Sequence, residues 1–278
     1  MKKLGLILVL VVALLATLIT GCANEQLSQE ELEQLVTDVL TANSEVNTCR
    51  FDMHTQTLFE QIGGQNHGNG TMEGTGTGVI DSSNRKMEML LNMDINMPEN
   101  EKQTVSMESH VVGGWMYIKM NAPDADEQIM KMKLPDGMWD KQSEMSQQIS
   151  LLQSAESVDY IGTETVNGII SYVVEIVPSR SYLEALLSEM NMPDIEGAEN
   201  LEFNLADLVK EMSFKQWIAK DSHLFVRSAT SVIIEITPEA IGAEDADFEK
   251  LTMDQTAELD FYGYNEAVSI DIPAELQE

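Results

Sequence analysis

The segment Lys86-Met87-Glu88-Met89-Leu90-Leu91-Asn92-Met93-Asp94-Ile95-Asn96-Met97 alternates apolar and polar side chains over most of its length. Successive side chains of a β-strand point to opposite faces of a sheet, so this pattern predicts a strand with one apolar face. The same alternation recurs near 49–54, 105–111, 130–134 and 251–261. The chain is therefore predicted to be rich in half-buried strands.

Further segments complete the predicted sheet. Strands are expected near 70–81, 115–121, 158–166, 169–177, 213–220 and 223–236, which makes about eleven in total. Asn167-Gly168 between two apolar runs predicts a hairpin, and the short connections predict antiparallel neighbours. Trp115, Tyr117 and Trp217 fall within predicted strands, where we expect them to contribute to packing.

Helical spacing interrupts this strand pattern. Ser28 and Glu31 form a capping box before apolar residues that recur at helical spacing as far as Leu40. Further helices are expected over 138–153 and 181–192, and a short one over 204–212. These elements predict one α+β domain over 31–278, in which amphipathic helices cover the apolar face of a long antiparallel sheet.

The N-terminal residues have the pattern of an export signal. Lys2 and Lys3 precede an uncharged apolar run that extends from Leu4 to Ile19. The end of this run and the three residues after it, Leu18-Ile19-Thr20-Gly21-Cys22, resemble the lipobox of bacterial lipoproteins. That resemblance implies cleavage of residues 1–21 and lipidation of Cys22, with 22–30 as a lipidated tether. The alternative is ordinary signal cleavage that leaves Cys22 as a plain thiol.

The amino-acid composition limits the classes of partner that the protein can bind, and the predicted anchor indicates its location. The 278 residues include 16 basic and 47 acidic side chains, for a formal net charge of −31. Such a surface repels polyanions, which excludes nucleic acid as a partner. The expected location is the extracytoplasmic side of the cell membrane, where the lipid anchor holds the protein. Cys49 is left without a disulfide partner once Cys22 is lipidated, and we expect it to be a small buried hydrophobe.

Four segments carry a resemblance to a known family: Val112–Met120, Gly162–Gly168, Lys215–Asp221, and Phe261–Asn265 with Ile270–Pro273. They resemble the LolA/LolB-like superfamily, which includes the LppX/LprG-like lipoproteins, and in particular a methionine-rich group within it. The resemblance implies an unclosed antiparallel β-barrel whose helices cover the concave face. It also implies that this face holds lipid acyl chains. Ala219 departs from the family pattern, which usually has an acid there, and no binding residue is carried over.

Residue patterns for other chemistry are weak in this chain. Its 18 methionines could supply soft ligands for Cu(I), but the four histidines do not neighbour the methionine runs in a ligand pattern, so an adaptable apolar surface is the preferred interpretation. Gly74–Gly78 has neither the lysine nor the following helix of a phosphate-binding loop. Acidic runs near 124–127 and 244–249 do not match a Ca²⁺-binding loop. We expect no cofactor, no metal and no enzymatic activity.

The predicted function is binding or transport of an apolar ligand. A lipid is the expected ligand, because flexible methionine surfaces accept varied partners and suit acyl chains. The expected site lies between the sheet and the helices over 138–153 and 181–192, and no charged headgroup anchor is predicted. Its lining is predicted to comprise Met89, Leu91, Met93, Met107, Met130, Met132, Leu152 and Leu186. The alternative is a structural or interaction lipoprotein with a closed core and no ligand.

Replacing Cys22 with Ala tests the anchor. The variant should lose the lipid, because the thioether requires the Cys22 sulfur, and should remain uncut and differ from the parent in intact mass. Mass spectrometry of both proteins after cell fractionation measures this. A parent that is membrane-attached but carries no lipid would contradict the prediction.

Overall fold

The computed structural model describes residues 27–64, 68–97, 102–123, 126–135, 139, 144–189, 208–242 and 247–276. The predicted signal, Cys22 and most of the tether lie outside these residues. The strands are β1 (Thr48–Ile62), β2 (Gly68–Asp81), β3 (Lys86–Asn96), β4 (Gln103–Val112), β5 (Trp115–Asn121), β6 (Gln128–Lys133), β7 (Ala155–Val166), β8 (Ile169–Pro178), β9 (Val209–Ala219), β10 (Phe225–Ile236) and β11 (Lys250–Tyr262). The helices are α2 (Gln29–Ser44), α4 (Glu144–Gln153), α5 (Arg180–Glu189) and the short 3₁₀ helix η2 (Ala274–Leu276).

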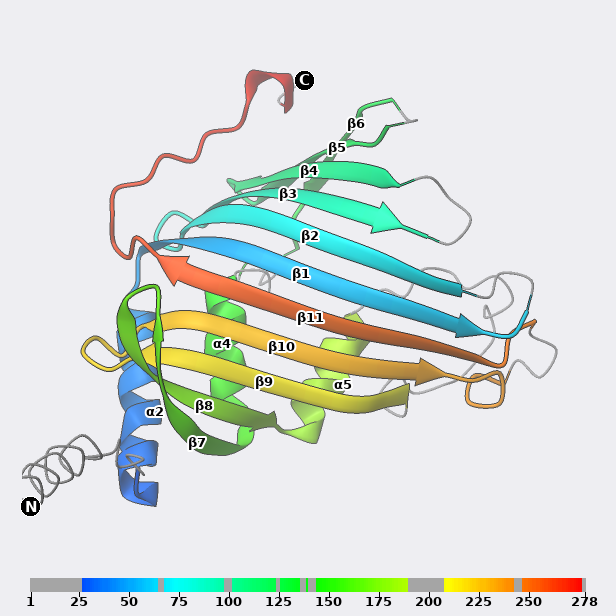
Figure 1. The fold of residues 1–278 in the computed structure, drawn as a ribbon. Helices are drawn as coiled ribbons and strands as arrows, with labels where there is room; N and C mark the ends of the chain where they lie inside the picture. The colour runs from blue at the N-terminus through cyan, green and yellow to red at the C-terminus, as the bar shows by residue number, and fades with distance from the viewer. Residues whose placement is uncertain are drawn as a thin grey trace, which may run out of the picture.

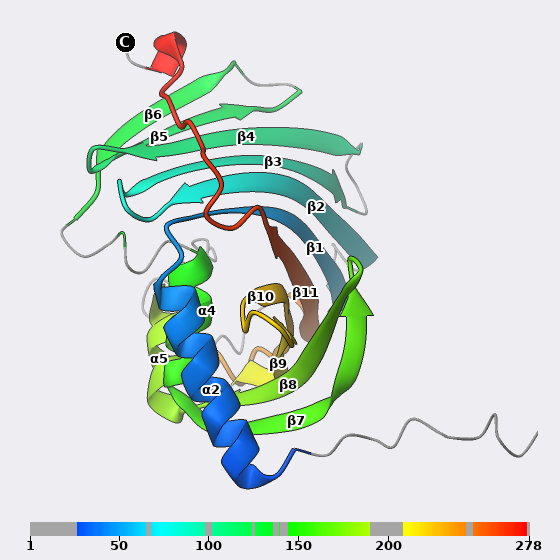
Figure 2. The same ribbon diagram turned by 90° about the vertical axis from the view of Figure 1, so that its left-hand side faces the viewer.

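The strands form one sheet in the order β6-β5-β4-β3-β2-β1-β11-β10-β9-β8-β7. Neighbouring strands are antiparallel, and β1 pairs with β11, so the first and last strands lie side by side at the centre of the sheet. Figure 1 shows the long, strongly bent strands. In Figure 2 the sheet forms an open arc, and α2, α4 and α5 lie on its concave side near β7 and β8. The predicted α+β fold with an unclosed antiparallel barrel is confirmed.

Helix α2 begins where the sequence predicts. Ser28 caps it, and the Ser28 hydroxyl and the Glu31 carboxylate form the reciprocal bonds of a capping box. Its inward face buries Leu32, Leu35 and Val39 in the main core. At the other end Asn43 donates to the His223 carbonyl at 3.0 Å, which ties the helix to the turn between β9 and β10. Among the described residues, no helix is long and apolar enough to cross a membrane.

Three phenylalanines pack together, with tilted rings, at the centre of the core. The rings of Phe225 and Phe51 each lie 6.4 Å from the ring of Phe261. Phe51 is fully buried and lies against Gly78 of β2, where an added Cβ would be 2.1 Å from a ring atom. Gly78 pairs directly with Phe51, so a larger residue at 78 would require the ring to move. Glycine in a strand interior often marks such a close approach.

Helix α4 is attached to the sheet by buried amides. Gln148 Oε1 accepts from Ser228 Oγ of β10 at 2.6 Å and from Gln216 Nε2 of β9 at 3.1 Å. All three side chains are less than a tenth exposed. Buried polar groups must be hydrogen-bonded to avoid a desolvation cost, so this cluster specifies where α4 sits.

Two expectations need correction. The helix predicted over 204–212 does not extend to 212, because β9 begins at Val209 and pairs with β10. The apolar residues of this segment fit the spacing of a helix and that of a strand. The pairing with β10 determines that the segment is a strand. Trp115 begins β5 as predicted but is 39% exposed, with Lys131 Nζ 5.7 Å from its ring centroid. Tyr117 is buried, and half-buried Trp217 donates its indole N–H to Glu164 at 2.8 Å.

Several other predictions are confirmed. Cys49 is buried in the main core. Asn167 and Gly168 form the β7–β8 turn with φ of 52° and 82°, as expected for a hairpin turn that needs two left-handed residues. The helix over 144–153 lies within its predicted range, and the helix over 180–189 begins one residue before the predicted 181. Part of each predicted range is outside the described residues.

Replacing Gly78 with Ala should destabilise the protein by about 1–3 kcal/mol, because the new methyl overlaps the Phe51 ring. The measurement is urea unfolding of residues 23–278. In a Phe51→Leu background the same change should cost less, since the ring atoms it meets are gone. An equal cost in both backgrounds would contradict the contact.

Replacing Gln148 with Ala should cost about 1–3 kcal/mol, because Gln216 and Ser228 lose a buried acceptor. Gln153→Ala, at an exposed position of the same helix, is the matched control and should change stability by less than about 0.5 kcal/mol. Thermal melts of both variants measure the difference, and equal midpoints would exclude this role for Gln148.

Candidate functional site

Six of the predicted lining residues lie on one face of the sheet. Directly paired residues of adjacent strands point to the same side. Leu91 of β3 pairs with Met107 of β4, and Met93 pairs with Val105. Met89 joins Met130 through the row Met89, Ser109, Ile118 and Met130. Met132 joins Met87 through the row Met132, Met116, Val111 and Met87. We call these side chains of β3–β6 the methionine face.

The methionine face continues into the core. Met87 and Val111 belong to it and are 4% and 1% exposed, in the same cluster as the apolar residues of α2. It is therefore the concave face. Its cover is thinner away from Met87 and Val111. Along β3 and β4, Met89, Leu91, Met93 and Met107 are half-buried, and in the edge strand β6, Met130 and Met132 are 40% and 45% exposed.

The two predicted helical residues are placed differently. Leu152 of α4 is 3% exposed and packs in the main core. The most extensive contacts of α4 are with α2, β7 and β8, so Leu152 lies toward the other half of the arc. Leu186 belongs to α5, but its side chain lies outside what the structure describes. The helices therefore cover mainly the β7–β8 side, whereas the sequence predicts them opposite the methionines.

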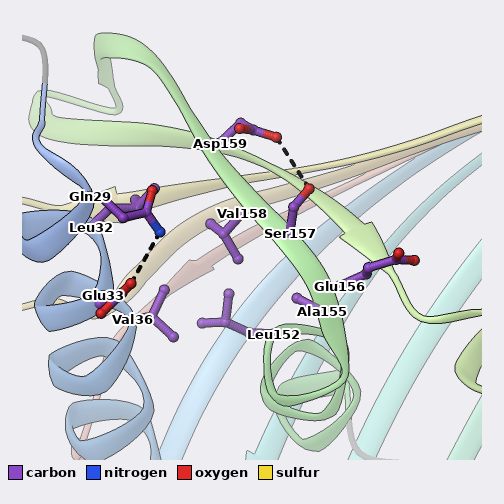
Figure 3. A pocket seen from close by; sticks show the side chains of 10 residues that line it. All are labelled: Gln29, Leu32, Glu33, Val36, Leu152, Ala155, Glu156, Ser157, Val158 and Asp159. Atoms are coloured by element: carbon purple, nitrogen blue, oxygen red, sulfur yellow. Dashed lines mark hydrogen bonds between the residues drawn. The ribbon is translucent and has the colours of Figure 1, made fainter.

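One pocket of about 360 Å³ lies between the start of α2, the end of α4 and the start of β7. Figure 3 shows its apolar floor, which includes Leu32, Val36, Leu152 and Val158. Its rim is acidic: Glu33 accepts from Gln29 at 3.2 Å, and Asp159 accepts from Ser157 at 3.3 Å. The side chains of the rim already bond to one another, and the pocket is at the opposite side of the arc from β6.

A second pocket of about 460 Å³ lies at one end of the methionine face. We call it the turn pocket, because the β2–β3 turn, the β4–β5 turn and the segment after β6 enclose it. Its lining consists of Asn84, Arg85, Val111, Gly113, Gly114, Leu134, Pro135 and Trp139. Both pocket volumes are within the range of about 300–1,000 Å³ that is usual for small-ligand sites.

Neither Arg85 nor Trp139 is among the site residues that the sequence predicts. Arg85 follows a turn signal, and nothing in the local pattern distinguishes it from other exposed turn residues. Its relevance arises from the tertiary fold, which brings the turn at 82–85 beside the turn at 113–114 and Leu134. A cation at the end of an apolar face indicates a binding site for an anionic headgroup, but this pattern becomes visible only once the pairing of β2 through β6 is known.

Charged side chains gather on the opposite, convex face. Arg227 of β10 bonds Asp260 of β11 at 2.6 Å and Glu258 at 3.0 Å. The hydrogen bond from Arg227 holds the pKa of Asp260 below its usual value. Within the described ranges, no group of three or more His, Cys, Asp or Glu side chains is arranged to hold a metal ion. The concave face is thus the apolar one and the convex face the ionic one.

Known structures with a similar outline include two mycobacterial lipoproteins. Lipoprotein LppX of Mycobacterium tuberculosis is 13% identical with a TM-score of 0.43, and the match covers 88% of this chain and 100% of that one. LprF of Mycobacterium bovis is 10% identical with a TM-score of 0.44, and the match covers 88% of this chain and 98% of that one. No curated protein matches the sequence.

The model of one protein family matches residues 31–278, which include every helix and strand described here from β1 onward and most of α2. The chain belongs to this family, which is described as a family of unknown function, DUF6612.

Proposed function

We propose that this protein is a membrane-anchored extracytoplasmic lipoprotein that binds or carries an apolar ligand of the lipid class. The proposal combines the predicted anchor at Cys22 with the character of the methionine face. It describes a binding protein and assigns no catalytic residue.

The observation that carries the proposal is the incomplete cover of the methionine face. Met89, Leu91, Met93 and Met107 are half-buried although they share one face with the fully buried Met87 and Val111. Soluble proteins rarely leave a large contiguous apolar surface uncovered unless something binds there. An apolar ligand would remove this surface from water, with a gain of about 25 cal/mol for each Å² buried.

The residue type favours a flexible ligand. Methionine has three rotatable bonds and a polarisable sulfur, so a methionine surface can adapt to chains of different shape. Apolar walls discriminate a single methylene by only about 1–3 kcal/mol. We therefore expect loose selectivity for chain length along this face.

The open sheet and the position of its helices also support a more specific relationship. We propose that this chain belongs to the LolA/LolB-like superfamily that its sequence motifs resemble. The lipid anchor would then keep the concave face close to a membrane from which a ligand could be taken.

Replacing Met93 with Trp tests the site, because the indole would occupy space on the methionine face. A fluorescent fatty acid should bind residues 23–278 saturably, and the variant should bind it about tenfold more weakly, which corresponds to about 1.4 kcal/mol. Leu90→Trp is the matched control: Leu90 is on the same strand, 43% exposed and on the convex face.

Equal loss of binding in the two variants would contradict a site on the concave face. Mass spectrometry of organic extracts from the purified, tagless protein provides a second, independent measurement. An extract without lipid, together with no saturable binding in the titration, would leave the interaction-protein alternative.

A further inference from the structure

The turn pocket contains a cation at the end of the methionine face. We propose that it binds the anionic headgroup of an acyl-chain ligand, with the Arg85 guanidinium as the counter-charge. This inference rests on the proposed function and adds to it the chemical class of the ligand: a carboxylate or phosphate carried on a long acyl chain.

Arg85 is held at the pocket by the β2–β3 turn. Its backbone N–H donates to the Ser82 carbonyl at 3.3 Å, and its φ of 51° is in the left-handed region. The nearby carboxylate of Asp81 is engaged by Asn84, which donates its backbone N–H at 3.0 Å and its side-chain amide at 2.8 Å. The acid that could neutralise Arg85 within the turn is thus already bonded elsewhere.

Arg85 differs from several cations of this acidic chain, although lysines such as Lys131 and Lys133 likewise form no ion pair among the described residues. Carboxylates pair with Arg227, Lys102, Lys119 and Lys250. Arg85 forms no ion pair within the part of the chain that the structure describes. A guanidinium beside a pocket is well suited to carboxylate or phosphate, because its planar fork of donors matches their geometry.

The rest of the pocket leaves room for such a group. An added Cβ at Gly113 or Gly114 would meet no atom within 4 Å, so the β4–β5 turn leaves open space there. The Gly114 carbonyl accepts from the Leu134 N–H at 2.9 Å, which ties this turn to the segment after β6. Half-buried Trp139 packs against the main core and offers an apolar surface to the first part of a chain.

Register connects the pocket to the methionine face. Val111 lines the pocket and pairs with Met87 on one side and Met116 on the other. Met87 and Val111 are covered by the core, so an acyl chain would have to displace this cover to pass from the pocket to the half-buried Met89, Leu91 and Met93. From Met87 to Met93 the concave face spans six residue steps along β3, or about 20 Å at 3.3–3.4 Å per residue. An extended long acyl chain is of similar length, so a ligand with its headgroup at Arg85 could lie along this face.

The test compares ligands that differ only in charge. A neutral fluorescent acyl probe on residues 23–278 is displaced by dodecanoate, by dodecyl phosphate or by dodecanol at pH 8. The parent should bind the two anions about tenfold more tightly than the alcohol, a factor that corresponds to about 1.4 kcal/mol. The relative affinity of carboxylate and phosphate distinguishes a fatty acid from a phospholipid-type headgroup.

Arg85→Gln should remove this preference and leave dodecanol binding unchanged, whereas Arg85→Lys should retain most of it. Arg180→Gln controls for the loss of one positive charge, because Arg180 is exposed on α5 and paired with Glu184 at 2.8 Å. Anion preference that is absent in the parent, or intact in Arg85→Gln, would overturn the inference and leave the proposed function standing. If neither the probe nor any of these ligands binds the parent, both fail.

Discussion

The contact between the Phe51 ring and the backbone of Gly78 is the constraint on which the centre of this fold depends. A side chain at 78 would occupy the space of the ring, so the glycine lets the far end of the Phe51 ring lie against the backbone of β2. Phe51 in turn contacts Phe261 of β11, the strand that pairs with β1 on its other side. Glycine within strands is a device that allows a sheet to bend. The packing of the aromatic core against β2 therefore depends on this pair of residues.

A bent sheet of eleven strands has more concave surface than the three α-helices in the described part of the chain can cover. The Gln148 cluster attaches α4 to β9 and β10, and α2 is attached through Asn43 to the β9–β10 turn. Both attachments lie on the same half of the arc. The other half keeps its apolar side chains but has a thinner cover, because the polar bonds that position the helices are not there. The division of the concave face into a packed half and an open half thus follows from where the buried amides are.

Alternation of apolar residues was sufficient to predict most strands and the side to which their methionines point. A period of two assigns every second residue to one face, so Met89, Leu91 and Met93 had to lie together. The same reasoning could not distinguish helix from strand near 208–212, where apolar residues fit both periods. It also could not place the helices over the correct half of the sheet, since that depends on contacts between residues far apart in the sequence, such as Gln148 and Ser228. The exposure of Trp115 also depends on distant contacts. Its place in a strand was predictable from the sequence, but whether other residues would cover its side chain was not.

The cation at the turn pocket is placed in a chain whose formal charge is −31, and this net charge affects how an anionic ligand binds there. The field of so acidic a surface opposes the approach of any anion, including a fatty acid or a phosphate ester. At physiological ionic strength, however, that field is screened over about 8 Å, whereas a guanidinium in direct contact with its counter-ion acts over a much shorter distance. A local cation can therefore determine which end of an amphiphile is held even though the protein as a whole repels it. The apolar face would provide most of the affinity, and Arg85 would provide orientation and the choice between charged and neutral headgroups.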